Sequence, residues 1–216
     1  MAKLKVAVLI SGSGSNLQAL LDMCTAENAP AEIVRVISNV PTAYGLERAK
    51  QAGVATTVIN HKDYDSRESF EDALNQMLDS ENIEMICLAG FMRLLTDSFV
   101  QKWKDMLINI HPALLPSFKG LHTHERAIEA GVKFHGATVH YVRPNMDEGP
   151  IIIQACVPVL PNDTADDLGK RVLEQEHKIY PLALRMIAKR QVRVSAEKVV
   201  YNGVDNLMES MMNPEG

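Results

Sequence analysis

The chain has 216 residues, 46% of them hydrophobic and 23% charged, which is typical of soluble globular proteins. Its formal net charge of -5 argues against whole-surface binding of nucleic acid, and three widely spaced cysteines form neither a disulfide framework nor a zinc site. The apolar run at 6–10 is too short for a signal peptide, and no segment approaches the ~20 apolar residues of a membrane helix. We therefore expect a single cytoplasmic domain that binds neither nucleic acid nor membranes.

Short apolar segments alternate with helix-like segments through the first half of the chain. Apolar residues at helical spacing separate the first four segments, whereas the first and fourth segments are nearly continuous hydrophobes. Such alternation predicts an α/β fold of the Rossmann-like kind, a mostly parallel twisted sheet with helices on both faces. The expected strands cover 4–10, 32–38, 55–60, 83–90 and 105–110.

The pattern changes after residue 110 and predicts an antiparallel addition in the C-terminal part. Residues 137–142 and 150–159 are expected to form two strands, and a helix is expected from about Asp163 to Tyr180, with Pro181 kinking or restarting it. We predict a mononucleotide-binding half (1–104), a catalytic half (105–194), and a small hairpin with a frayed tail (195–216).

The sequence SGSGSN at 11–16 follows the first expected strand and opens a helix. N–H groups of a glycine loop at a helix N-terminus suit a phosphate, and Ser15 and Asn16 can add side-chain hydrogen bonds. A dinucleotide fingerprint would need glycine where Leu17 stands, and the Gly-Lys-Ser/Thr of a Walker A loop is absent. Either a site for a single phosphate or a tight turn with a helix cap fits this segment.

The sequence AGFMRLL at 89–95 follows the fourth expected strand. Met92, Leu94 and Leu95 could form the walls of an apolar slot with Arg93 at its edge, or they could be core residues of the next helix. The sequence alone supports both interpretations equally.

Asn109 and His111 end the fifth expected strand. Alternation by two places both side chains on one side, at the strand end where parallel sheets bind ligands. An amide and an imidazole there suit an oxyanion and a proton transfer, although a lone histidine is often structural. Pro112 and Pro116 would restrict the loop that follows.

Three other groups of polar residues are ambiguous. The histidines at 122 and 124 lack the spacing of a helical zinc site, so we expect no metal. Asp147 lies between Pro144 and Gly149, where an ordinary turn would also explain it. Glu176 belongs to the sequence LEQEHKIYP, which by itself looks like a solvated helix face.

Taken in order, these segments resemble the folate-dependent formyltransferase family, and within it the glycinamide ribonucleotide formyltransferases of purine synthesis. The resemblance runs from about residue 4 to about residue 194. HPALLPSFKG marks the wider family, whereas SGSGSN and the short chain indicate this branch. The other matching segments are LAGFMRLL, HGATVHYV, MDEGPII and EQEHKIYP.

The resemblance implies roles for individual residues. It implies a catalytic trio of Asn109, His111 and Asp147, and binding of the ribonucleotide by Gly14, Ser15, Asn16 and Glu176. It implies that the co-substrate is 10-formyltetrahydrofolate, that no metal is needed, and that the protein is a monomer or homodimer. The implied folate contacts are Arg67, Met92, Arg93, Leu94, Leu95, Asn109, Arg143 and Asp147.

Three alternatives remain at this point. Methionyl-tRNA formyltransferases carry an added C-terminal RNA-binding domain, and formyltetrahydrofolate deformylases carry an added N-terminal regulatory domain. We expect neither, because the first strand begins at residue 4 and only about 20 residues follow residue 194. A non-catalytic nucleotide-binding module would bind a mononucleotide without folate.

Overall fold

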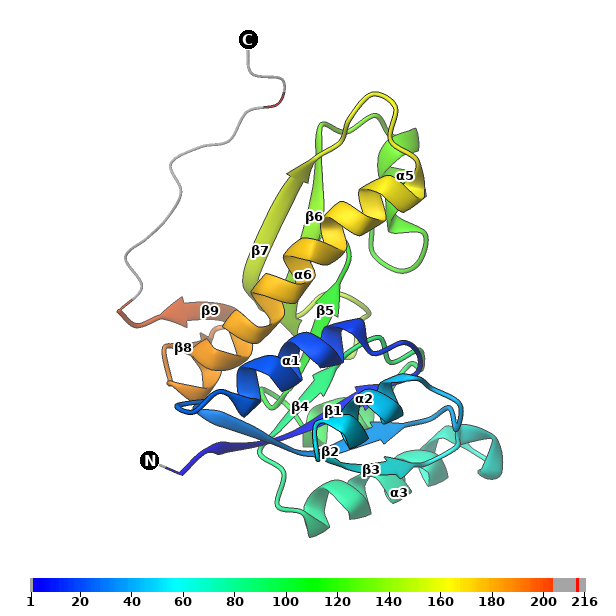
Figure 1. Ribbon diagram of the computed structural model, residues 1–216, viewed down its shortest axis with the longest axis vertical. Coiled ribbons are helices and arrows are strands. Elements are labelled where there is room, and N and C mark those ends of the chain that lie inside the picture. Colours follow the sequence, from blue (N-terminus) through cyan, green and yellow to red (C-terminus); the bar gives the residue numbers. More distant parts are fainter. Residues whose placement is uncertain (1, 204–212, 214–216) are drawn as a thin grey trace.

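The computed structural model describes residues 2–203 and 213, so the predicted frayed tail lies outside the described residues apart from Asn213. One sheet has seven strands in the order β3-β2-β1-β4-β5-β6-β7, and β8 and β9 form a separate two-stranded sheet (Figure 1). The strands are β1 (Leu4–Ile10), β2 (Ala31–Ser38), β3 (Ala55–Val58), β4 (Met85–Leu88), β5 (Leu107–His111), β6 (Phe134–Tyr141), β7 (Ile151–Pro158), β8 (Val192–Ser195) and β9 (Lys198–Tyr201).

Strands β1 to β5 are parallel to one another, β6 runs antiparallel to β5, and β7 runs antiparallel to β6. This arrangement confirms the predicted fold class, including the antiparallel addition. Residues 6–10 of β1 and all of β4 are buried, as expected for strands covered on both faces. No helix among the described residues is long and apolar enough to span a membrane.

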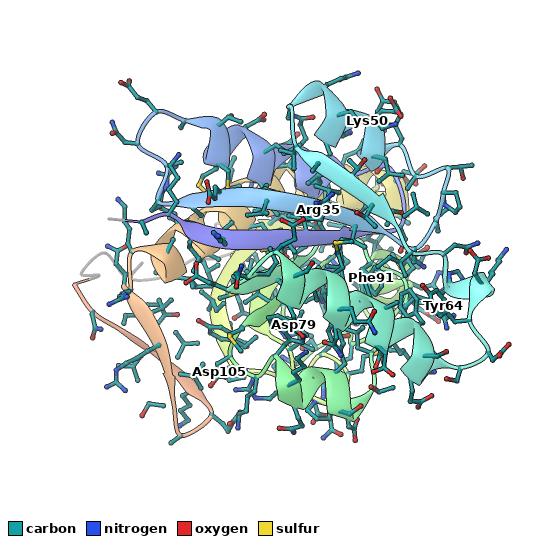
Figure 2. The ribbon with its side chains drawn as sticks, turned by 90° about the horizontal axis from the view of Figure 1, so that it is seen from below. Arg35, Lys50, Tyr64, Asp79, Phe91 and Asp105 are labelled. Carbon is teal, nitrogen blue, oxygen red and sulfur yellow. The ribbon has the colours of Figure 1, made fainter. Side chains whose placement is uncertain are left out.

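Helices cover both faces of the large sheet (Figure 1). One apolar core joins α1, α2 and α6 to the sheet, and a second joins α3 and α4 to the other face, which Figure 2 views from below with Asp79 marking α3. The helices are α1 (Ser15–Thr25), α2 (Gly45–Gln51), α3 (Arg67–Ser80), α4 (Asp97–Lys102), α5 (Thr123–Glu129) and α6 (Ala165–Ala188), with a 3-10 turn at His61–Asp63.

Helix α6 differs from its predicted extent. It begins after a capping box formed by Thr164 and Asp167, and it continues through Pro181 to Ala188 instead of restarting there. A proline inside a helix lacks one N–H donor. Burial of Pro181 and of the following turn, including Leu184, against the sheet offsets that loss.

The C-terminal hairpin begins at Val192. Strands β8 and β9 pair antiparallel from Val192 and Tyr201 to Ser195 and Lys198. The Tyr201 hydroxyl donates to the Ile152 carbonyl of β7 over 2.6 Å, which attaches the hairpin to the main sheet. The proposed division of the chain into two functional halves stays a prediction.

Candidate active site

The carboxyl ends of three adjacent parallel strands, β1, β4 and β5, lie at one edge of the sheet. The glycine loop 11–14 follows β1, the segment 89–96 follows β4, and His111 ends β5. Ligands bind at this edge of open α/β sheets, where the strand order reverses. The three segments selected from the sequence therefore meet at one place.

The glycine loop is shaped by contact with α2. The carbonyl of Gly12 accepts from Gly45 N–H over 3.0 Å, and the carbonyl of Ser13 accepts from Arg48 Nε over 2.9 Å. Gly14 has φ +71°, and a Cβ there would lie 2.6 Å from the Gly45 Cα. Two glycines in backbone contact thus turn the loop carbonyls toward α2, and no side chain caps the first turn of α1. Its N–H groups remain available for an anion.

A pocket of about 210 Å³ lies over this loop. Residues 11–16 form one wall, and residues of the segment after β4 form the other. The pocket thus joins the predicted phosphate loop to the predicted apolar slot. The lining residues of the second wall are Ala89, Gly90 and Met92.

Asn16 and Glu176 come together from opposite ends of the chain. The Asn16 amide donates to the Glu176 carboxylate over 2.6 Å, and Glu176 is buried. Burial raises the pKa of Glu176, whereas the hydrogen bond from Asn16 lowers it. The Asn16 Oδ1 is buried without a hydrogen-bond partner among the described residues. A ligand donor fits this unsatisfied oxygen.

His111 and Asp147 lie side by side, and His140 connects Asp147 to Asn109. His111 Nδ1 lies 3.5 Å from Asp147 Oδ2, and His111 Nε2 lies 3.0 Å from the carbonyl of Phe118. A carbonyl only accepts, so Nε2 carries a proton, and a proton on Nδ1 as well would make the contact with Asp147 attractive. Nε2 of His111 therefore donates to the Phe118 carbonyl, and Nδ1 faces the Asp147 carboxylate.

Asp147 occupies a strained turn, with φ +57°. Its Oδ2 accepts from Gly120 N–H over 2.9 Å. The Asp147 carboxylate therefore joins three segments: its own turn, the strand end at His111, and the 117–122 loop.

His140 is a further site residue, to which the sequence pattern assigns no role. It pairs with Asn109 across β5 and β6, and its Nε2 lies 3.4 Å from the Asn109 amide nitrogen and 3.9 Å from Asp147 Oδ1. Burial lowers the pKa of His140 to about 4, so the ring is neutral near pH ~7. Its Nδ1 donates to the Tyr141 carbonyl over 3.0 Å, which leaves Nε2 to accept from Asn109.

The residues expected to contact folate differ in their exposure. Met92 and Leu94 are 70% and 61% exposed, and helix α4 starts only at Asp97, so these two are not core residues of a helix. Arg93 and Leu95 are partly buried. Arg67 is exposed at the start of α3, one turn from Glu71, whose carboxylate accepts from the N–H and hydroxyl of Thr96.

Arg143 lies apart from the trio. Its guanidinium donates to Asp105 and to Glu197, each over 2.6 Å, and these bonds direct it toward the β8–β9 hairpin, near which Figure 2 places Asp105. The structure therefore does not bring the Arg143 side chain together with Asp147. Among the described residues, no group of three or more histidine, cysteine or acidic side chains is placed to hold a metal ion.

Comparisons with known proteins identify the family. The family model described as formyl transferase matches residues 4–184. The chain is 44% identical over 200 residues to phosphoribosylglycinamide formyltransferase of Escherichia coli, covering 93% of this chain and 94% of that protein. It is 50% identical over 192 residues to the human trifunctional purine biosynthetic protein adenosine-3, covering 89% of this chain but only 19% of that protein.

Solved structures agree. Glycinamide ribonucleotide transformylase 1 from Symbiobacterium toebii superposes with a TM-score of 0.89 at 45% identity, covering 92% of this chain and 94% of that one. A phosphoribosylglycinamide formyltransferase from Coxiella burnetii gives 0.89 at 44% identity, with coverages of 94% and 95%. The chain belongs to the formyltransferase family, and within it to the phosphoribosylglycinamide formyltransferases.

Proposed function

We propose that the protein transfers a formyl group from 10-formyltetrahydrofolate to the amine of glycinamide ribonucleotide, a step of purine synthesis. The observation that carries the proposal is the convergence of Asn109, His111 and Asp147 beside a pocket suited to a phosphate. The names of two relatives at 43% and 44% identity, both phosphoribosylglycinamide formyltransferases, support the same acceptor and the transfer of a formyl group, and a relative at 50% identity is named for purine biosynthesis.

The ribonucleotide is proposed to bind across the glycine loop and α6. N–H groups at Gly14, Ser15 and Asn16 take the phosphate, where the α1 dipole favours negative charge. Asn16 holds Glu176 in place, and the buried Glu176 carboxylate binds the glycinamide part. Removal of water from Glu176 strengthens that contact.

The folate co-substrate is proposed to bind between the 89–96 segment and the Asp147 turn. Exposed Met92 and Leu94, with Leu95 behind them, offer apolar surface to a flat heterocycle, and Arg67 and Arg93 offer charge to its acidic groups. The engaged guanidinium of Arg143 limits its part in the proposal to the backbone of the 143–147 segment.

Formyl transfer places negative charge on the formyl oxygen when the amine attacks the formyl carbon. The Asn109 amide donates one N–H to neutral His140, which leaves its second N–H to stabilise that charge. A protonated His111 adds positive charge on the same side of β5.

Asp147 is proposed to have two functions. Its contact with a protonated His111 is attractive, and its carboxylate relays the proton of the attacking amine through water to the folate nitrogen, as the bond between that nitrogen and the formyl carbon breaks. The strained turn and the Gly120 N–H hold the carboxylate at that position.

Three variants test the trio: Asn109→Ala, His111→Ala and Asp147→Asn. Each is expected to lower turnover at least ~100-fold, because each removes charge stabilisation or proton transfer. Asp79→Asn, an exposed aspartate of α3 paired with Lys102, is the matched control and should keep wild-type turnover. Near-wild-type turnover in all three site variants would contradict the mechanism.

A single assay separates transfer from its alternatives. The protein is incubated with 10-formyltetrahydrofolate with and without glycinamide ribonucleotide, and folate absorbance is followed. A change that requires the ribonucleotide is expected. A change without it would indicate hydrolysis of the formyl group, and no change in either case would indicate a binding protein.

A further inference from the structure

Ser11 connects the two segments that form opposite walls of the site. It follows the last residue of β1 and is the first residue of the glycine loop. Its N–H donates to the Gly90 carbonyl over 3.1 Å, and its hydroxyl accepts from Met92 N–H over 2.8 Å. Ser11 thus makes two bonds to the segment after β4.

Asn39 fixes the direction of the Ser11 hydroxyl. Its proton goes to Asn39 Oδ1 over 2.6 Å, so a lone pair faces Met92 N–H. Asn39 is only 2% exposed, and its amide nitrogen lies 3.1 Å from His61 Nδ1. A chain of polar contacts therefore runs from Met92 in the pocket wall through Ser11 and Asn39 to His61.

Among the described residues, the hydrogen bonds of the 89–96 segment other than those to Ser11 lie at its two ends, and Phe91 and Leu95 pack against the second apolar core. Ala89 N–H donates to the Leu9 carbonyl over 2.9 Å, and Thr96 is held by Glu71. The bond to Ser11 holds Met92, inside the segment, where its exposed side chain lines the pocket. Loss of that bond would free the wall without detaching the ends.

We propose that Ser11 is a positioning residue for both substrates. Its hydroxyl fixes the distance between the loop that takes the phosphate and the segment that takes the folate, so the amine and the formyl group meet in register. This inference rests on the proposed function of the two segments. Ser11 itself touches neither reacting atom.

Ser11→Ala leaves the Met92 N–H and the Asn39 Oδ1 without their partner. We expect kcat to fall about 10-fold, because the reacting groups lose register, and KM to rise about 10-fold for both substrates, because one wall shifts relative to the other. Ser11→Thr keeps the hydroxyl and should restore both KM values. Exchange of the Met92 amide proton, followed by NMR, should become about 10-fold faster in Ser11→Ala and return in Ser11→Thr.

Ser38→Ala is the matched control. Ser38 ends the adjacent strand β2, is fully buried and does not line the pocket, and among the described residues its hydroxyl bonds only to the backbone of Val40. This variant should leave both KM values and Met92 exchange unchanged even where it lowers stability. A change in one KM only, or unchanged Met92 exchange in Ser11→Ala, would overturn the role of Ser11.

The two proposals fail separately. Met92 exchange and calorimetric binding of each substrate do not depend on turnover. If the wild-type protein shows no formyl transfer that depends on the ribonucleotide, the proposed function is refuted. The exchange rate of the Met92 amide proton still decides whether Ser11 holds Met92. Active wild type with Ser11→Ala kinetics unchanged would refute only the positioning role.

Discussion

Acidification should destabilise the protein through His140. The ring is 2% exposed, and its pKa falls from 6.5 to about 4 on folding. Burial is the main cause; the positive charge of His111 lowers the value further, whereas the bond to Tyr141 and the Asp147 carboxylate raise it. Between these two pKa values the unfolded chain binds more protons than the folded one, so the free energy of unfolding decreases as the pH falls through this window.

The size of the effect follows from the two pKa values. Between about pH 7 and about pH 5 the unfolded state gains roughly 2 kcal/mol from protonation of this one histidine. His140→Gln removes the titrating group, so its free energy of unfolding should depend less steeply on pH by about that amount. Its stability near pH ~7 will also change, because the bond to Tyr141 is lost, but only the slope tests the reasoning.

Urea unfolding followed by the fluorescence of Trp103 measures this slope. Trp103 is the chain's single tryptophan, is buried beside α4, and donates to Asn75 over 2.8 Å, so its emission should change on unfolding. His122→Gln is the control, because the His122 side chain is 76% exposed. Equal slopes for wild type and His140→Gln would refute a neutral, buried His140.

Two further predictions concern the glycine loop. Gly14→Ala should lower stability by at least ~1 kcal/mol and raise KM for the ribonucleotide in steady-state kinetics. Gly14 has φ +71°, and an added Cβ would meet the Gly45 backbone. Unchanged stability and unchanged KM would contradict a fixed loop. Arg48→Met should raise the same KM about 5-fold to 10-fold with kcat retained, since it frees the Ser13 carbonyl and removes a charge. Lys50→Met changes an exposed residue of the same helix, α2, and should leave this KM unchanged.

The parallel part of the fold and the placement of two members of the trio could be predicted because local patterns determine them. Continuous apolar runs indicated buried strands, and alternation by two placed Asn109 and His111 on one side of β5. The rule that ligands bind at the carboxyl ends of parallel strands then required no knowledge of distant contacts. The same rule selected the glycine loop.

Contacts between distant segments could not be predicted in this way. The register that sets His140 opposite Asn109 depends on how β6 pairs with β5, and one residue of slip would turn His140 to the other face. The ion pairs of Arg143 depend on where Asp105 and Glu197 fall in space. In α6, packing of the turn after Pro181 outweighed the local rule that proline ends a helix.

Asp147 shows why the family resemblance was needed for the third member of the trio. An aspartate between Pro144 and Gly149 fits an ordinary turn, and nothing in the local pattern points it at a histidine 36 positions earlier. The fold brings them together because β6 returns alongside β5 and the turn after it folds back, with Asp147 in the left-handed region. Aspartate tolerates that conformation better than most residues, and the contacts with Gly120 and His111 hold its carboxylate in place. Seven other described residues besides glycine also have positive φ, so the contacts with Gly120 and His111, and not the backbone conformation, distinguish Asp147.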